Sequence, residues 1–379
     1  MRVGFDATPA VTQGAGIGRY TRELLRALAA VDHANDYRLI YAATPQARAR
    51  QHTLPALPPN FHVRRLPFHD IWLARVWHRA QVPLPVNWLT GPIDVFHSPD
   101  FTLPPVSGGT RTLLTVHDLS FVRDPESALA VLRAYLNRVV PRSVARADHI
   151  LADSQATRAD LIELYGTPPA KISVLYSGVN DSFHPVTDPA ALAAVRRRYG
   201  LGAWPFLLAV GTLQPRKNYV RLIQAFAQLR QPDLRLVFVG GRGWLYDAIF
   251  AEVERLGLKD RVYFPGFAAD ADLPALYTAA RVLAYPSLYE GFGLPILEAF
   301  ACGTPVVTST AACLPEIAGD AALLVPPTDV PALAAALELA VSDEALRADL
   351  RRRVPARLAL FSWERSARQL LQTYQRLAA

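Results

Sequence analysis

The sequence predicts an α/β protein built from two doubly wound units, each a parallel β-sheet with helices on both faces. Three observations lead to this fold class. Short apolar runs alternate with amphipathic stretches along the whole chain, as expected for consecutive βαβ units. Most of the runs are continuously apolar, which is typical of parallel strands buried on both faces. The length of 379 residues allows two domains of ordinary size.

The individual strands follow from these apolar runs. In the first half they are expected over 2–7, 37–42, 94–98, 111–117, 149–154 and 172–178. In the second half they are expected over 206–213, 234–241, 261–267, 281–287, 305–309 and 321–326. Helical patterns lie between them, for example over 18–31 and 219–230. The segment 180–189 is rich in Pro, Asp and Ser and is typical of a linker, so we place the first domain at 1–183 and the second at 184–360.

The composition limits the class of protein. The chain is 51% hydrophobic and 19% charged, which indicates a packed globular protein and not a disordered one. Its two cysteines, Cys302 and Cys313, cannot form a disulfide framework, so a reducing cytoplasmic location is expected. No apolar run approaches the roughly 20 residues that cross a bilayer. The strand-like start, with Asp6 close behind it, argues against a signal peptide.

The formal net charge of +7 favours an anionic partner. No nucleic-acid motif accompanies this charge, and we expect no nucleic-acid partner. The basic triplets 196–198 and 351–353 are expected on solvated helix faces. A membrane surface, or a lipid-diphosphate acceptor on it, is the preferred interpretation. The segment 71–79 interleaves Trp72 and Trp77 with basic residues, and it either lies in a membrane interface or forms an ordinary helix with its aromatic side in the core.

The segment 290–298, EGFGLPILE, places two carboxylates around a glycine-containing loop and the start of a helix. Pro295 is expected at the first helical position, where a missing N–H costs nothing. The N–H groups and dipole of such a helix start attract an anion such as a diphosphate. Glu290 lies in the loop and Glu298 about one turn into the helix, so both can accept hydrogen bonds from hydroxyl groups. The alternative is an ordinary helix start with a flexible loop and one surface glutamate.

Adjacent cations follow the first strand of the second domain, in the segment 211–218, GTLQPRKN. A turn after a strand is where this kind of fold binds phosphate. Arg216 can hold a diphosphate through two hydrogen bonds, and Lys217 acts as a point charge. The alternative is that both are solvent-exposed turn residues.

Several other polar residues of the sequence remain open to two interpretations. His97 and His117 each end a predicted strand, where ligands bind, but each can equally be a buried histidine with its hydrogen bonds satisfied. The glycines of 13–20, QGAGIGRY, do not have the spacing of a dinucleotide fingerprint. Asp270 and Asp272 are spaced like a metal motif, but Asp272 directly precedes a helical pattern and is interpreted as its N-cap. We therefore expect no metal site.

Segments along nearly the whole chain resemble family 4 glycosyltransferases, which are retaining enzymes of the GT-B fold. The resemblance rests on MRVGFDATPAVTQGAGIGRYTRELLRAL, DVFHSP, TVHDLSF, ADHILADSQATRADL, LLAVGTLQPRKN, VFVGG and EGFGLPILEAFACGTPVVTS. With GIGRYTREL and GTLQPRKN, the chain is most similar to the bacterial mannosyltransferase-type branch that builds surface polysaccharides. The resemblance implies two facing Rossmann-like domains with the active site in a central cleft. It also implies that the last helix, about 361–379, packs back on the first domain.

The resemblance implies roles in the second domain for the donor. Lys217 and Arg216 would hold the diphosphate, and Thr212 stands where many relatives carry an arginine, so the role transfers more cleanly to Lys217. Glu298 would bind the ribose and Glu290 the transferred sugar. The backbone N–H groups at Phe292, Gly293 and Leu294 would meet sugar hydroxyls and phosphate.

In the first domain, the resemblance implies that Gly16 lets its loop approach the diphosphate and that His117 lies against the transferred sugar. Asp118, His97 and Arg19 are candidates for the acceptor side. The expected donor is GDP-mannose, with a UDP- or dTDP-linked sugar as the alternative, and the expected acceptor is a saccharide or lipid-linked saccharide. A non-catalytic nucleotide-sugar-binding protein is the alternative from another class. No cofactor and no metal ion are expected, and the expected location is the cytoplasm, with or without peripheral contact at the inner membrane face.

Overall fold

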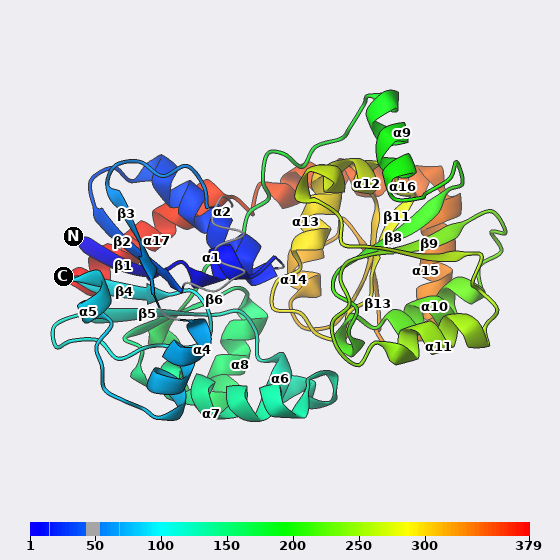
Figure 1. Ribbon diagram of the computed structural model, residues 1–379. Helices are drawn as coiled ribbons and strands as arrows, with labels where there is room; N and C mark the ends of the chain where they lie inside the picture. Colours follow the sequence, from blue (N-terminus) through cyan, green and yellow to red (C-terminus); the bar gives the residue numbers. More distant parts are fainter. Residues whose placement is uncertain (15, 43–53, 68) are drawn as a thin grey trace. The chain divides into compact units, whose positions relative to one another are not determined.

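The computed structural model describes residues 1–14, 16–42, 54–67 and 69–379 (Figure 1). The chain forms two compact units. The first comprises residues 1–119, 131–178 and 362–379, and the second comprises 120–130 and 179–361. The chain passes from one to the other near residue 178, where the linker pattern suggested 183. The segment 120–130, expected in the first domain, groups with the second unit, where the Trp244 indole N–H donates to the Ser127 carbonyl (2.7 Å).

The first unit is a parallel sheet of seven strands in the order β3-β2-β1-β4-β5-β6-β7. The order reverses between β1 and β4, as in a doubly wound sheet. The strands are β1 (Arg2–Asp6), β2 (Asp36–Ala42), β3 (Phe61–Leu66), β4 (Val95–Ser98), β5 (Arg111–Val116), β6 (His149–Ala152) and β7 (Ile172–Val174). The helices are α1 (Thr8–Thr12), α2 (Gly16–Val31), α4 (Asp70–Leu73), the π-helix η2 (Ala74–Arg79), α5 (Asn87–Thr90), α7 (Ala130–Arg146), α8 (Gln155–Tyr165), the 3-10 turn η4 (Pro169–Lys171) and α17 (Trp363–Ala378).

Strand β3 was not expected from the sequence. It lies at the edge of the sheet, and the side chains between its two buried ends, Phe61 and Leu66, are exposed. An edge strand of this kind is not buried on both faces, so it lacks the continuous apolar run that marks the central strands.

The last helix completes the first unit. Helix α17 begins at the N-cap Ser362, whose hydroxyl accepts from the Arg365 N–H. Its buried side includes Leu370 and Tyr374, and it packs beside α2 at this unit (Figure 1). Helix α2 contributes Leu24 to the same core. The end of the chain therefore belongs to the unit with which the chain begins.

The second unit is a parallel sheet of six strands in the order β10-β9-β8-β11-β12-β13, reversing between β8 and β11. The strands are β8 (Phe206–Val210), β9 (Arg235–Val239), β10 (Val262–Gly266), β11 (Val282–Tyr285), β12 (Val306–Ser309) and β13 (Leu323–Val325). The α-helices are α6 (Ser120–Arg123), α9 (Pro189–Arg198), α10 (Tyr219–Ala227), α11 (Asp247–Arg255), α12 (Leu273–Ala279), α13 (Leu294–Ala301), α14 (Leu314–Ala318), α15 (Val330–Ser342) and α16 (Glu344–Leu358). Short 3-10 turns are η3 (Pro125–Ser127), η5 (Pro215–Lys217) and η6 (Asp270–Asp272).

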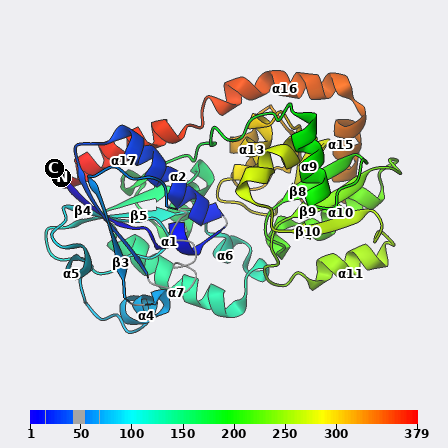
Figure 2. The ribbon, with the colours of Figure 1, turned by 45° about the horizontal axis from the view of Figure 1, so that its top comes forward.

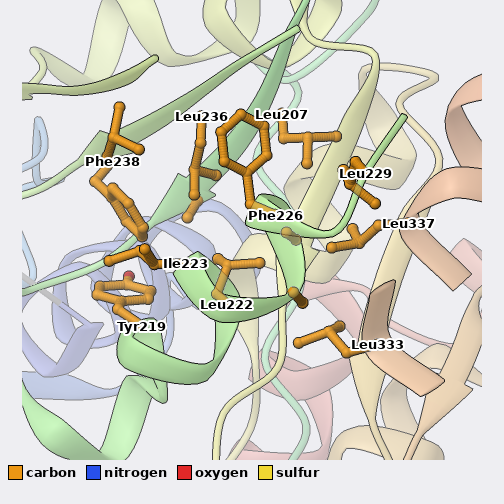
Figure 3. Close-up of a cluster of buried hydrophobic side chains, with 14 of the residues drawn as sticks. Leu207, Tyr219, Leu222, Ile223, Phe226, Leu229, Leu236, Phe238, Leu333 and Leu337 are labelled. Atoms are coloured by element: carbon orange, nitrogen blue, oxygen red, sulfur yellow. The ribbon is translucent and has the colours of Figure 1, made fainter. Parts of the chain in front are cut away.

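The core of the second unit lies between the sheet and helices α10 and α15 (Figure 3). Leu207 and Leu236 come from the strands, Phe226 from α10 and Leu337 from α15. Helix α16 follows α15 and runs along the same unit (Figure 2). These contacts fix the sheet whose strand ends carry the candidate site.

Glycine shapes the ends of β8 and β9. Gly240 has φ of 157°, and a Cβ atom there would lie 2.0 Å from the Gly211 carbonyl oxygen. Only glycine allows this close approach of the two strand ends. The loop that follows β8 and carries Lys217 therefore leaves the sheet at a fixed place.

The two tryptophans of the segment 71–79 differ in burial. Trp77 is buried and its indole N–H donates to the Leu84 carbonyl (2.9 Å), whereas Trp72 is 60% exposed. Trp77 thus agrees with a helix whose aromatic side lies in the core, and contact of Trp72 with a membrane interface stays a prediction. Within the described part of the chain, no helix combines the length and the apolar character that spanning a bilayer requires.

Candidate functional site

The second sheet brings Lys217, Arg216 and Glu290 together at its switch point. Turn η5 with the two cations follows β8, and Glu290 lies in the loop after β11, the neighbouring strand at which the order reverses. Ligands of doubly wound sheets bind beyond the carboxyl ends of the strands at this point. Lys217 Nζ lies 2.7 Å from Glu290 Oε1, and an Arg216 terminal nitrogen lies 2.6 Å from Glu290 Oε2. The residues predicted from two motifs that are far apart in the sequence thus form a single cluster.

The cluster is buried and charged. Glu290 is 6% and Lys217 8% exposed, so the alternative of solvent-exposed turn cations does not describe them. Burial alone would raise the pKa of Glu290, but the charges of Arg216 and Lys217 lower it to about 2. One carboxylate therefore faces two cations at neutral pH, and the cluster keeps a surplus positive charge.

Several residues that sequence reasoning missed hold this cluster in place. Asn218 adopts the left-handed conformation with φ of 61°, and its amide donates to the carbonyls of Pro286 (2.9 Å) and Pro327 (2.6 Å). Lys217 Nζ donates to the Tyr285 hydroxyl (2.8 Å) and lies 4.8 Å from the centre of the same ring. Tyr285 ends β11, so its place at a strand end was the signal in the sequence.

Helix α13 begins at Leu294, so Pro295 occupies its second position and not the expected first one. Gly293 precedes the helix with φ of 109°, a conformation that favours glycine. Phe292 is buried and its ring meets that of Phe361 edge to face. The first N–H groups of any helix lack intrahelical acceptors, and here they follow directly on the loop that carries Glu290.

The thiol of Cys313 lies beneath the same loop. Its Sγ lies 3.1 Å from the Glu290 carbonyl oxygen and 2.9 Å from that of Phe292. Cys313 is fully buried. This cysteine therefore supports the backbone of the loop that carries Glu290, a role that its place in the sequence did not indicate.

Glu298 lies in α13, as expected, but it is only 2% exposed. Its Oε2 accepts from the Tyr277 hydroxyl (2.7 Å). The alternative interpretation of one surface glutamate therefore does not hold. Thr212 is half-buried after the end of β8, and Leu294 is half-buried at the start of α13.

The first unit places His117 between two oxygen acceptors just beyond β5. Its Nδ1 lies 2.7 Å from Asp153 Oδ2, and its Nε2 lies 2.7 Å from the Pro99 carbonyl oxygen. Burial would lower the pKa of His117, but Asp153, Asp100 and the Pro99 carbonyl raise it to about 9. Because both partners are acceptors, both ring nitrogens carry protons. His117 is thus a buried imidazolium, and Asp153, at the end of β6, is the partner that sequence reasoning missed.

Carboxylates surround the switch point of the first sheet. Asp6 ends β1 and accepts from the Thr8 N–H (2.9 Å), while Asp100 follows β4 and accepts from the Gln13 side-chain amide (2.8 Å). Burial raises the pKa of both carboxyl groups. The contact from Gln13 to Asp100 links the end of α1 to the loop after β4, at the place where a doubly wound sheet binds ligands.

The other predicted residues of the first unit lie close to these strand ends. Gly16 opens α2, and among the described residues no atom other than its chain neighbours and the backbone of its own helix lies within 4 Å of where its Cβ would be. Arg19 is half-buried in the first turns of α2. Asp118 is half-buried directly after His117 and its charge contributes to the raised pKa of Asp153.

His97 lies inside the fold. It is fully buried in β4, and its ring nitrogens lie 2.7 Å from the Tyr374 hydroxyl and 2.9 Å from the Thr115 hydroxyl. Burial, followed by the charge of His117, lowers its pKa to about 3, so the ring is neutral. Of the two interpretations of His97, the structure favours a histidine with satisfied hydrogen bonds that ties β4 to β5 and α17.

Of the two aspartates at 270 and 272, Asp272 forms an ion pair with Arg198. Asp272 occupies the N-cap position of α12, as expected, but its side chain makes no capping hydrogen bond. Its carboxylate instead accepts from Arg198 (2.6 Å) and from the Tyr199 hydroxyl (2.7 Å). Among the residues that the structure describes, no group of three or more His, Cys, Asp or Glu side chains is placed to hold a metal ion.

Known proteins match this chain along its whole length. Residues 14–183 match the family described as Glycosyltransferase Family 4, and residues 197–357 match Glycosyl transferases group 1. The chain is 33% identical to O-antigen chain mannosyltransferase B of Escherichia coli over all of both chains. It is 30% identical to the serotype-specific mannosyltransferase WbdA of Escherichia coli, over 74% of this chain but only 36% of WbdA. It is 35% identical to D-inositol 3-phosphate glycosyltransferase of Salinispora tropica, over 70% of this chain and 59% of that protein.

Solved structures share the fold. Sucrose-phosphate synthase from Thermosynechococcus elongatus superposes with a TM-score of 0.76 at 24% identity, over 100% of this chain and 99% of that one. HepE of Anabaena, in complex with UDP and glucose, superposes with a TM-score of 0.75 at 21% identity, over 99% of both chains.

The two parallel sheets and these neighbours define the GT-B fold. The chain belongs to family 4 of the glycosyltransferases. It is therefore a glycosyltransferase, an enzyme that transfers a sugar to an acceptor.

Proposed function

We propose that this enzyme is a retaining mannosyltransferase that moves mannose from GDP-mannose to a saccharide or lipid-linked saccharide in surface polysaccharide synthesis. The observation that carries the donor assignment is the buried cluster of Lys217, Arg216 and Glu290 at the second switch point. A surplus positive charge at this place suits a diphosphate. Support for mannose and for the polysaccharide comes from the full-length relative, whose name describes an O-antigen chain mannosyltransferase.

The cations and the start of α13 would stabilise the departing diphosphate. Lys217 and Arg216 are fixed by the fold before any ligand arrives, and fixed donors act without reorganisation. The N–H groups at Phe292, Gly293 and Leu294 would add donors from the backbone. Thr212 would contribute its hydroxyl after β8. These groups supply the positive charge that a metal ion would otherwise provide, so we propose a reaction without metal or cofactor.

Glu290 would change partners when the donor binds. Without donor, its two oxygens take the hydrogen bonds of Lys217 and Arg216. Phosphate oxygens then compete for the same cations. A carboxylate with a pKa of about 2 stays ionised and can accept from a hydroxyl of the transferred sugar. Glu298 would accept from the ribose hydroxyls while the Tyr277 hydroxyl holds it in place.

The first unit would bind the acceptor and the reacting end of the sugar. A protonated His117 has no lone pair to take a proton, so it cannot act as general base in this state. We assign it to positioning the strand ends that meet the sugar. Gly16 would admit the diphosphate, and Arg19 and Asp118 remain candidates for acceptor contacts. We propose a cytoplasmic location with peripheral contact at the inner membrane face, where lipid-linked acceptors lie.

The donor is tested by a thermal-shift panel of GDP-, UDP-, ADP- and dTDP-sugars. A ligand at 100 times its dissociation constant adds about 2.7 kcal/mol of stability. We expect the largest shift with GDP-mannose, together with release of GDP when an acceptor is present. A larger shift with a UDP- or dTDP-sugar would show that this nucleotide sugar, and not GDP-mannose, is the donor. A shift with no nucleotide release for any acceptor extract would indicate a binding protein.

The stereochemistry is tested by NMR of the product taken early in the reaction. The proposal predicts an α-glycoside from an α-linked donor. A β-glycoside would require a general base and would overturn the role given to His117.

A further inference from the structure

The basic triplets 196–198 and 351–353 each contribute an arginine to one hollow of the second unit. The hollow has a volume of about 290 Å³, and four arginines line it: Arg196, Arg281, Arg347 and Arg351. Helices α9, α12 and α16 gather at this edge of the unit (Figure 1). Arg351 is exposed, as expected for a solvated helix face, whereas Arg196 is half-buried, and the two converge on the hollow from distant parts of the sequence.

Two of the four arginines are fixed by the fold. Arg196 donates to the carbonyls of Gly202 (2.8 Å) and Trp204 (3.1 Å). Arg347 has a side chain only 7% exposed and donates to the Ala340 carbonyl (3.0 Å). These contacts hold two positive charges at the wall of the hollow, whatever occupies it.

The other two arginines are exposed and have donors to spare. The Arg281 side chain is exposed, and no ion pair or hydrogen bond of its guanidinium occurs among the described residues. Arg351 donates to the Gly303 carbonyl (3.1 Å) and to Glu344 (3.1 Å), with its side chain 44% exposed. Glu344 also pairs with Arg347. One carboxylate thus serves two of the four arginines.

Glu344 offsets only part of the positive charge of the four arginines. No carboxylate is found among the described residues that line the hollow. The pKa of Arg196 is lowered, first by burial and then by the positive charge of Arg281. Like charges held this close repel one another unless an anion lies between them.

We propose that this hollow binds a phosphate-bearing anion at a site separate from the donor site. The planar guanidinium group donates two parallel hydrogen bonds to phosphate oxygens, and four such groups against one nearby carboxylate leave three positive charges. The lining residues 205 and 280–281 directly precede β8 and β11. The hollow therefore lies at the amino ends of the strands whose carboxyl ends carry Lys217 and Glu290. The phosphate belongs either to a free anion or to a lipid headgroup.

The test separates this hollow from the donor site. Inorganic pyrophosphate is titrated by calorimetry into the full chain carrying Lys217→Ala, in which the donor site is weakened. Binding is expected to remain. Adding Arg281→Ala and Arg351→Ala should then lower the affinity roughly tenfold or more, since two charge-assisted contacts are lost.

The matched control adds Arg197→Ala and Arg352→Ala to the same Lys217→Ala chain. Both residues are exposed neighbours of the lining arginines, and the control removes the same charge outside the hollow. Its affinity should stay within about twofold. Melting curves of all variants verify folding, and Arg281→Gln with Arg351→Gln provides a second test pair if the alanine pair melts early.

The source of the phosphate is decided by co-sedimentation with vesicles of equimolar phosphatidic acid and phosphatidylcholine. Vesicle binding that needs Arg281 and Arg351 assigns a lipid phosphate, and pyrophosphate binding alone assigns a free anion. The proposal is overturned if neither probe depends on these two arginines, or if the control pair loses as much affinity as the test pair.

Discussion

The two units carry different ionisable groups at the same point of the same sheet topology. In both sheets the strand order reverses beside the first strand of the unit, between β1 and β4 and between β8 and β11. The second switch point carries Arg216 and Lys217 around one carboxylate. The first carries Asp6 and Asp100. The shared topology thus provides a place for a ligand, and the charge of the side chains there decides which ligand fits.

In the proposed function, this difference would assign the donor to the second unit and the acceptor to the first. The positive switch point would attract a diphosphate, whereas the carboxyl groups of the first can form hydrogen bonds with sugar hydroxyls. Each unit also buries one central charged group between partners of opposite polarity. In the second unit this is the Glu290 carboxylate between two cations. In the first it is the His117 imidazolium between two oxygen atoms.

Removing the positive charge from the second unit should have the largest effect. Lys217→Ala is expected to lower the rate of transfer by roughly 100-fold or more, as deletion of one preorganised electrostatic donor does. Steady-state kinetics and a melting curve measure the effect. Lys259→Ala is the control, because Lys259 pairs with Glu254 on the surface of the same unit. If the activity of Lys217→Ala stays within a few-fold of that of the unmodified enzyme, Lys217 has no catalytic role.

The two glutamates of the second unit should separate binding from rate. Glu298→Gln is expected to weaken nucleoside diphosphate binding roughly tenfold, since a ribose contact is lost. Glu290→Gln should bind the diphosphate at least as tightly, because a competitor for Lys217 and Arg216 is gone, yet transfer slowly. Its melting temperature should fall, since removing one partner of a buried ion pair typically costs about 3–5 kcal/mol. Calorimetry measures the affinity of each variant for the diphosphate. An equal loss of affinity in both variants would contradict these assignments.

The first unit should lose stability at high pH. The pKa of His117 is raised to about 9, above the value of about 6.5 for an unfolded chain. Its contribution to the free energy of unfolding is therefore fully present below about pH 6.5 and is lost as the pH rises through about 9. The loss should be about 3 kcal/mol, measured by urea unfolding across this range.

His117→Gln should abolish this pH dependence while lowering stability below pH 6.5. His62→Gln is the control, because the His62 side chain is 65% exposed and should leave the dependence intact. A steep fall in stability that persists in His117→Gln would show that another group is responsible.

The smallest effect is expected from removal of metal ions. Transfer should continue in EDTA, because Lys217 and Arg216 supply the positive charge and Asp272 is engaged with Arg198. Rates measured before and after dialysis against EDTA test this. Loss of transfer that Mg²⁺ or Mn²⁺ restores would show that a metal ion takes part, and the contrast between the two switch points would then need revision.

The sequence predicts the buried strands well and the polar partners poorly. Central strands such as β8 and β11 are continuous apolar runs, so their existence and the loops after them could be predicted. The edge strand β3 could not, since most of its side chains are exposed. The motifs placed Lys217 and Glu290 at strand ends, but nothing in their spacing indicates that they form an ion pair.

The two histidines show why the rest of the site could not be predicted without the tertiary structure. His97 and His117 occupy similar places at the ends of neighbouring strands, and no local pattern distinguishes them. His97 meets hydroxyl groups and is neutral, whereas His117 meets Asp153 and is charged. The partners come from α17 and from β6, far away in the sequence. Only the sheet order brings them together.

The proposed function requires that the cations of the second switch point bind the donor's diphosphate. Calorimetry can compare a nucleoside diphosphate, GDP first, with its nucleoside, in the unmodified enzyme and in Lys217→Ala. We expect the diphosphate to bind far more tightly than the nucleoside to the unmodified enzyme, and most of this preference to disappear in Lys217→Ala. If the preference is unchanged in Lys217→Ala, these cations do not bind the diphosphate.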